Sequence, residues 1–290
     1  MSGGPSKAML AELRSRPGQN TWPAALLRWS MIGISLLFLA ALLIAPLITV
    51  FATALDKGVL AYLRAFDSYD TRAAIKLTLI TAAVVVPLNT VFGLAASWCI
   101  AKFEFRGKAF FTTLIDLPLA ISPVIAGLVY VLVFGLQGWF GAWLQDHNIS
   151  IVFAWPGIIL ATLFVTFPYV ARELIPLMQQ VGNDEEEAAI TLGAGGWMTF
   201  FRVTLPKVRW GLIYGVILCN ARAMGEFGAV SVVSGHIRGL TTTLPLDVEI
   251  LYREYNTVGA FAAASLLTLL AMVTLVIKTI VESRGYHGGK

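Results

Sequence analysis

The chain of 290 residues is unusually apolar, with 57% hydrophobic and only 13% charged residues and a mean hydropathy of +0.76. Soluble domains carry about 25% charged residues, so this chain has too little polar surface to remain in solution as a globular protein. The same composition excludes a disordered chain. A membrane protein remains, and since a span takes about 20 apolar residues, the length allows roughly five to seven helices.

The chain begins with a polar segment that is followed by a long apolar run. Residues 1–28 carry four basic residues against the single acidic Glu12, which predicts a cytoplasmic N-terminal tail. The apolar run over residues 29–54 is longer than the roughly 7–15 residues of a signal-peptide core. We therefore expect it to be an uncleaved first transmembrane helix.

Five further apolar runs lie within residues 73–280 and predict the core of an all-α membrane domain. One of them contains Pro118 and Pro123, which remove backbone donors and are expected to break the helix. Irregular backbone at membrane depth is tolerated only against protein or a water-lined cavity, so this span is expected to face the bundle interior or a pathway. Cys99 and Cys219 lie in apolar runs and are predicted to be small buried residues. The expected spans are 73–101, 109–134, 156–171 with an extension toward 181, 210–234 and 257–280, followed by a cytoplasmic tail over 281–290.

Basic residues are distributed unevenly between the segments that join these spans. With the amino terminus inside, the inner segments hold fourteen Lys and Arg residues, counting Arg172 and Lys278 at the inner ends of their spans, and the outer loops hold five. Because positive residues collect on the cytoplasmic side of membrane proteins, this bias predicts six transmembrane helices with both termini cytoplasmic. It also accounts for the net charge of +4, so membrane lipid is an expected partner and nucleic acid is not.

The most informative polar segment is the loop over residues 183–206. Asn183 or Asp184 can cap a short helix, and the acidic run Glu185–Glu187 suits the positive end of its dipole. Glycines from Gly193 onward are expected to end that helix, and Trp197–Val203 to form a second one. Such a pair of helices can dock in a groove of a partner protein or lie on the lipid surface, and the residues alone favour neither. The second helix is expected to present its aromatic residues on one side: Trp197, Phe200 and Phe201.

The same loop carries a family signature. Its pattern resembles the EAA motif of ABC importer permeases, EAA-x3-G-x9-I-x-L-P, with valine at the usual isoleucine position. The resemblance implies a type I importer fold, in which this loop forms coupling helices seated in a groove of an ATP-binding subunit. It also implies that Glu187 and Gly193 set the helix and its hinge, while neighbouring apolar groups contact the ATPase. The matching residues are Glu187, Ala188, Ala189, Gly193, Val203, Leu205 and Pro206.

Other stretches narrow the resemblance. Residues 220–229 are similar to the ARAxGEFGA stretch of sulfate, molybdate and tungstate permeases, and residues 230–239 resemble the sulfate branch. Three further segments, 116–118, 122–127 and 172–176, also resemble that branch. From about residue 30 to 284, the chain is similar to the W-type permease subunits of sulfate/thiosulfate importers.

This resemblance implies a multi-pass subunit of the bacterial plasma membrane within a larger complex. It implies a heterodimer with a second, homologous permease, two ATP-binding subunits, and a periplasmic binding protein that delivers sulfate or thiosulfate. ATP and Mg would be bound by the partner ATPase. We expect no cofactor or metal in this chain and no enzymatic activity of its own, because the sequence lacks the GxxxxGK[ST] phosphate loop and other catalytic motifs.

Two charged residues fall inside an expected span. Arg222 and Glu226 are four positions apart and so share one helix face, and a charge at the bilayer centre costs about 2.5–3.5 kcal/mol. That face should therefore point away from lipid. Either Arg222 donates hydrogen bonds to a tetrahedral oxyanion, or the two residues pair with each other or with a facing helix. Together with Ser231 and Ser234 they are the candidate pathway or gate residues.

Three other functions compete with a sulfate permease. A molybdate or tungstate permease shares the ARAxGEFGA stretch, and tetrahedral oxyanions differ little. An ion-coupled secondary transporter is disfavoured by the intact EAA loop and by the lack of inverted repeats. An intramembrane enzyme is disfavoured by the missing catalytic motifs. Asp116, beside Pro118, is expected to cap a helix end or to pair with a partner subunit rather than contact substrate.

Overall fold

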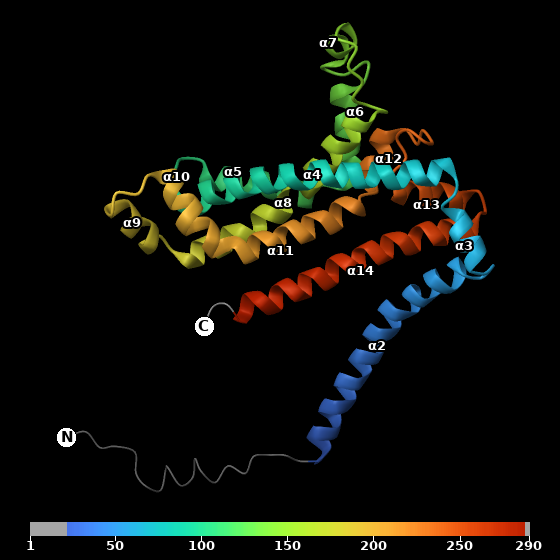
Figure 1. Ribbon diagram of the computed structural model, residues 1–290, viewed down its shortest axis with the longest axis horizontal. Coiled ribbons are helices and arrows are strands. Elements are labelled where there is room, and N and C mark those ends of the chain that lie inside the picture. The colour runs from blue at the N-terminus through green and yellow to red at the C-terminus, as the bar shows by residue number, and fades with distance from the viewer. Residues whose placement is uncertain (1–21, 288–290) are drawn as a thin grey trace. The chain divides into compact units, whose positions relative to one another are not determined.

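The computed structural model describes residues 22–287, and all regular structure in that range is helical. The chain divides into two units, residues 1–50 and residues 51–290. Most of the expected N-terminal tail lies outside the described residues, but residues 22–28 are helical, as is the expected C-terminal tail as far as His287. The helices in chain order are α2 (Trp22–Ala54), α3 (Val59–Ala65), α4 (Tyr69–Lys102), α5 (Lys108–Ala120), α6 (Pro123–Phe134), α7 (Gly141–Asp146), α8 (Trp155–Val181), α9 (Asp184–Thr191), α10 (Gly196–Thr199), the π-helical turn η1 (Phe200–Thr204), α11 (Leu205–Met224), α12 (Gly228–Ser234), α13 (Leu244–Arg253) and α14 (Thr257–His287) (Figure 1).

Four of the described helices, α2, α4, α8 and α14, are long and apolar enough to cross a membrane. Two bent pairs pass the same test together: α5 with α6, which meet at 106°, and the helix of residues 196–224 with α12, which meet at 48°. If each bent pair is one span, the count is 6, in agreement with the sequence prediction. In α2, large apolar side chains are exposed all around the helix, as is typical of a membrane span.

Only one of the two prolines expected to break the third span does so. Pro118 lies buried inside α5, whereas Pro123 is the first residue of α6, after Ile121 and Ser122 in non-helical conformations. A proline at the first helical position loses no intrahelical hydrogen bond, which is why the new helix begins there. The prediction of a break was right for Pro123 and wrong for Pro118.

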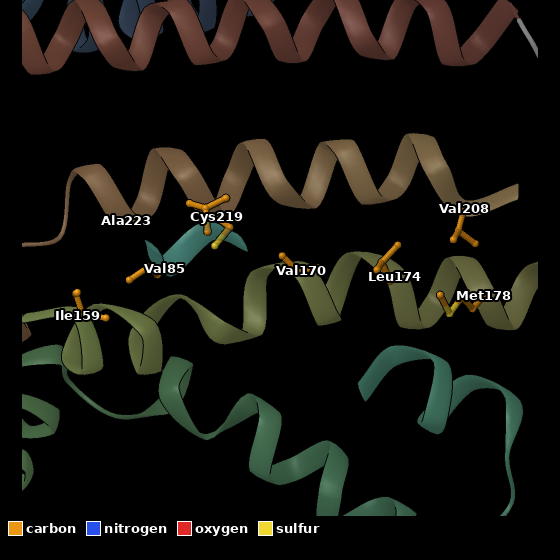
Figure 2. Packing of buried hydrophobic residues seen from close by; sticks show 9 residues of the cluster. Val85, Ile159, Val170, Leu174, Met178, Val208, Cys219 and Ala223 are labelled. Atoms are coloured by element: carbon orange, nitrogen blue, oxygen red, sulfur yellow. The ribbon is translucent and has the colours of Figure 1, made fainter. Parts of the chain in front are cut away.

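The core of the larger unit lies where α4, α8 and α11 run side by side (Figure 1). Gly93 brings α4 close to α8, since a Cβ there would lie 2.8 Å from the Cβ of Val170. Buried Asn89 crosslinks the same helices by donating to Thr166 Oγ1 at 2.7 Å. Cys219 is buried as predicted, but Cys99 is exposed on α4, so that prediction was wrong. Figure 2 shows the main hydrophobic cluster: Val85, Ile159, Val170, Leu174, Met178, Val208, Cys219 and Ala223.

Two segments expected to be polar loops contain helices. Residues 56–72 include α3, and residues 235–256 include α13. Helix α13 begins with Pro245 in its first turn, and its Leu244 and Leu246 are fully buried. Leu246 packs with Val230 of α12, so α13 forms part of the core.

Candidate functional site

The first half of the 183–206 loop, called here the coupling loop, forms the short helix α9. Its first turn carries four acidic residues, Asp184 and Glu185–Glu187, at the end where a helix dipole favours negative charge. Asn183 occupies the N-cap position, but its side chain makes no capping hydrogen bond. The expected helix start is therefore confirmed in position, while the dipole and not a side-chain cap supports it.

Helix α9 ends at Thr191, and Gly193 lies in the turn that follows, as the sequence predicts. Gly193 has φ +89°, a conformation that glycine adopts at little cost. Its N–H donates to the carbonyl of Ile190 at 2.9 Å, and the N–H of Ala194 donates to that of Ala189 at 3.0 Å. These two bonds make up a Schellman motif, which satisfies the last carbonyls of the helix and turns the chain.

The second half of the coupling loop differs from the expectation of a separate short helix. Helix α10, the π-helical turn η1 and α11 are continuous from Gly196 to Met224. Pro206 lies in the first turn of α11. Pro206 has no N–H to offer the carbonyl of Arg202, and the π-helical turn lies directly before it.

The three aromatic rings of this segment contact one another, as expected for residues on one side of a helix: the Phe200 ring lies 5.1 Å from that of Phe201 and 6.4 Å from that of Trp197. They differ in burial. Trp197 and Phe201 are exposed, at 73% and 58%, and their rings stack with centroids 6.1 Å apart. Phe200 is buried and packs against Trp98 of α4 with centroids 4.8 Å apart. The loop therefore turns one aromatic residue toward its own helices and two outward.

The signature residues lie mainly on the outward side. Glu187, Ala188, Gly193 and Pro206 are exposed, and Leu205 is partly buried. A hollow of about 330 Å³ lies between α9 and the segment of α10 and η1. Three signature residues are among those that line this hollow: Ala189, Gly193 and Val203.

The sequence reading missed a set of ionic contacts that hold the coupling loop to the helices. Glu185 pairs with Lys207 of α11 at 2.5 Å, and Glu186 pairs with Lys102 of α4 at 3.0 Å. Only the acidic run and the nearby basic residues were visible in the sequence, and their pairing depends on the tertiary fold.

At the far end of α11, Arg222 and Glu226 form an ion pair, with Arg222 Nη1 2.6 Å from Glu226 Oε2. The Glu226 side chain is buried, and its Oε1 also accepts the N–H of Ala229 at 2.9 Å, near the start of α12. The Arg222 side chain is 31% exposed. The pairing interpretation is therefore present in the structure, and Arg222 retains donors at an accessible surface.

The two candidate serines occupy different positions on α12. Ser231 is partly buried and donates to the carbonyl of Gly228 at 2.8 Å. Ser234 is completely buried, where its Oγ accepts the N–H of His236 at 3.1 Å and its carbonyl accepts the hydroxyl of Thr241 at 2.7 Å. Ser234 thus fastens the turn that follows α12.

The breaks of the two bent spans lie together. A Cβ on Gly228 would lie 2.9 Å from the Cβ of Pro123, so α12 and α6 touch where each begins. Nearby on α5, Asp116 pairs with Arg172 of α8 at 3.1 Å. Asp116 lies inside α5, so the expectation that it caps a helix end was wrong, and its pairing with a partner subunit stays a prediction.

This chain matches one protein family and is similar in sequence to known transport permeases. Residues 89–284 match the family described as binding-protein-dependent transport system inner membrane component. The sulfate transport system permease protein CysW of Escherichia coli (strain K12) is 52% identical over 89% of this chain and 88% of its own length. CysW of Synechocystis sp. (strain ATCC 27184 / PCC 6803 / Kazusa) is 52% identical, covering 90% of this chain and 95% of that protein. The sulfate transport system permease protein CysT of Escherichia coli (strain K12) is 33% identical over 87% of this chain and 91% of that protein.

The fold also resembles solved structures. A chain of a bacterial ABC transporter involved in the import of the acidic polysaccharide alginate matches with a TM-score of 0.75 over 92% of this chain and 98% of that one, at 16% identity. A second structure, of a bacterial alginate ABC transporter in complex with an alginate pentasaccharide-bound periplasmic protein, matches with a TM-score of 0.74 at 17% identity over 89% of this chain and 93% of that one. At this identity the likeness concerns the fold.

Proposed function

The chain belongs to the binding-protein-dependent transport system inner membrane components, and from this membership we propose that it is the permease subunit of an ABC importer for sulfate. The observation that carries the proposal is 52% identity to sulfate transport permeases over 89% of the chain. That similarity favours sulfate over molybdate or tungstate. Thiosulfate, which has the same tetrahedral shape and charge, is proposed as a second substrate.

We propose that the subunit works in a heterodimer with a second, homologous permease. The 33% identity to a CysT-type sulfate permease supports this, because it indicates that related permeases occur in two kinds. Two ATP-binding subunits would complete the membrane complex and hold ATP and Mg, since this chain carries no phosphate-loop motif. A periplasmic sulfate- or thiosulfate-binding protein would deliver the substrate. The excess of basic residues on the inner segments supports cytoplasmic termini.

The coupling loop is proposed as the contact with the ATPase. It turns an acidic residue, Glu187, and the stacked pair of Trp197 and Phe201 outward, which suits docking in a groove. Closure of the ATPases on ATP would press the two coupling loops of the heterodimer together. Because the helix is continuous from Gly196 to Met224, movement at the loop would be carried along α11 to its far end. Hydrolysis would reverse the movement and reopen the inner side.

The far end of α11 is proposed as part of the pathway or gate. Arg222 holds partly accessible donors for an oxyanion, and Glu226 fixes it at the break between α11 and α12. Glu226 also weakens the attraction of the site for a dianion, which suits passage better than tight binding. Ser231 lies on α12 beside this break, and buried Ser234 braces the turn that ends α12.

Uptake of labelled sulfate tests the function directly. A strain lacking this chain should lose uptake and regain it with the wild-type gene, with thiosulfate as a stronger competitor than molybdate. The purified chain should bring an ATPase and a distinct second permease with it. Co-purification of two copies of this chain with an ATPase would favour a molybdate-type transporter. Normal uptake by a stable complex with Arg222→Ala would remove the pathway role of Arg222.

A further inference from the structure

The three consecutive glutamates at the start of α9, Glu185–Glu187, lie in three different environments. Glu187 is exposed on the outward side, and Glu185 forms a pair with Lys207 in which the glutamate side chain is 65% exposed. Glu186 turns inward, with only 16% of its side chain exposed. Glu186 therefore does not belong to the surface proposed for the ATPase, although it lies beside the family signature.

Glu186 connects α9 to two other helices through one oxygen atom. Its Oε1 lies 3.0 Å from Nζ of Lys102, the last residue of α4, and accepts the hydroxyl of Thr204 at 2.7 Å. Thr204 is buried in the π-helical turn that leads into α11. The ammonium of Lys102, 5% exposed, also donates to the carbonyl of Gly182 between α8 and α9. This cluster of Lys102, Glu186 and Thr204 joins the ends of α4 and α8 to the start of α11.

An aromatic contact reinforces the same junction. The ring of Trp98 lies one turn before Lys102 on α4 and packs against Phe200 of η1 with centroids 4.8 Å apart. Its other neighbour is Phe103, the residue that ends α4, at 5.5 Å. The inward side of the coupling loop thus rests on the end of α4 by one polar and one aromatic contact.

Because it is buried, the pair of Lys102 and Glu186 is expected to contribute more to the stability of the junction than the more exposed pair of Lys207 and Glu185. Exposed pairs contribute little because water screens them, whereas removing one member of a buried pair leaves a charge without compensation. In the Glu185 pair, the side chains of Glu185 and Lys207 are 65% and 30% exposed, and Glu185 lies on the same helical turn as Glu186, so this pair provides a matched control. Substitution of Glu186 should disturb the junction, and the same substitution of Glu185 should not.

We propose that Lys102, Glu186 and Thr204 are positioning residues that clamp the coupling loop to α4 and α11, so that displacement of α9 moves these helices and is not absorbed within the loop. The proposal rests on the proposed function, because it needs an ATPase seated on the outward side of the loop. The three glutamates then have separate roles. Glu187 contacts the ATPase, Glu186 transmits the movement of the ATPase to the transmembrane helices, and Glu185 contributes little to this transmission.

The test compares transport with hydrolysis in the complete complex reconstituted in proteoliposomes. Glu186→Ala and Lys102→Ala should lower the sulfate transported per ATP hydrolysed by at least about fivefold, the lower end of typical coupling between sites. Glu185→Ala should leave this ratio unchanged. Thr204→Val should lower the ratio less, Thr204→Ser should restore it, and Glu186→Gln, which keeps an acceptor, should lie between wild type and Glu186→Ala. An unchanged ratio in Glu186→Ala, or an equal fall in Glu185→Ala, would overturn the proposal.

A second measurement keeps this proposal separate from the identity of the substrate. Amide hydrogen exchange in the purified complex, without sulfate, should become faster in residues 184–191 of Glu186→Ala than of Glu185→Ala, because α9 has lost its clamp. Equal exchange in the two variants would overturn the clamp. If the wild-type complex takes up no sulfate, the proposed function is wrong. The exchange data still test the clamp, because they are measured without sulfate.

Discussion

The two ends of the helix formed by α10, η1 and α11 use glutamates in opposite ways. At the coupling loop, Glu187 remains exposed, and with Trp197 and Phe201 it forms the surface proposed to contact an outside partner. At the other end, Glu226 is buried, and both of its oxygens are occupied by Arg222 and by the N–H of Ala229. The comparison suggests that the loop end is built for contact with another protein, while the break is built to hold its own geometry.

The largest effect is expected at the buried end. Glu226→Ala removes the partner of Arg222 and leaves the N–H of Ala229 without its acceptor, which should destabilise the complex by about 3 kcal/mol. The yield of assembled complex and its thermal midpoint in detergent report this loss. Glu187→Ala is the control at the other end: it removes a group proposed to contact the ATPase but should leave the thermal midpoint nearly unchanged, because its side chain is exposed. If the two variants lost stability equally, the proposed difference between the ends would be wrong.

A somewhat smaller effect is expected from the different burial of Phe200 and Trp197. Phe200→Ala removes a buried ring packed on Trp98 and should cost about 3 kcal/mol or less of stability, since the site lies near the surface. Trp197→Ala should leave the permease stable but weaken retention of the ATPase during purification, because this ring is 73% exposed. Thermal midpoints and the ATPase content of the purified complex separate the two outcomes. The prediction would be contradicted if both variants kept the wild-type thermal midpoint and lost the same amount of ATPase.

The contrast between Phe200 and its neighbours marks the limit of prediction from sequence. The helical spacing shows that residues 197, 200 and 201 share a side, but the sequence carries no direct sign of the π-helical turn or of the burial of Phe200 against Trp98. Apolar runs long enough to span a membrane were visible, because that signal is local and strong. The acceptor role of Glu226 and the pair of Lys102 with Glu186 were not visible, because they depend on how distant helices pack.

The two prolines also show that a local sequence signal does not by itself determine where a helix breaks. Both Pro118 and Pro123 lack an N–H, yet only Pro123 begins a new helix. Pro123 takes the first position of α6, where no N–H is needed, and touches Gly228 at the break of the other bent span, whereas Pro118 is buried within a continuous helix. The signature residues of the coupling loop could be placed in advance because their spacing defines a helix, a glycine turn and a second helical segment in one continuous stretch.

The turn of the coupling loop provides a smaller and sharper test. Gly193→Ala forces a side chain into φ +89°, with open space around it, so the cost should be conformational and about 1–2 kcal/mol. The expected result is a loosened turn after α9 and a lower ATPase content of the complex. Gly195→Ala is the matched control, since Gly195 has φ −73° and is equally open. Equal ATPase content in the two variants would show that the turn conformation does not matter for docking.

The smallest expected effect extends the comparison to a second buried acid near the break. Asp247 lies on α13 beside Leu246, which packs on α12, and burial raises the pKa of its carboxyl although a hydrogen bond from Thr71 opposes the shift. A raised pKa in the folded state means that the protonated form is favoured there, so the stabilising contribution is present at low pH and is lost as pH rises through the folded pKa. Asp247→Asn, which cannot ionise, should therefore raise the thermal midpoint slightly at neutral pH and match wild type in acid. The thermal midpoint of the complex in detergent, measured from acid to neutral pH, reports this difference. A variant that is less stable than wild type at neutral pH would show that the ionised carboxylate of Asp247 is stabilising.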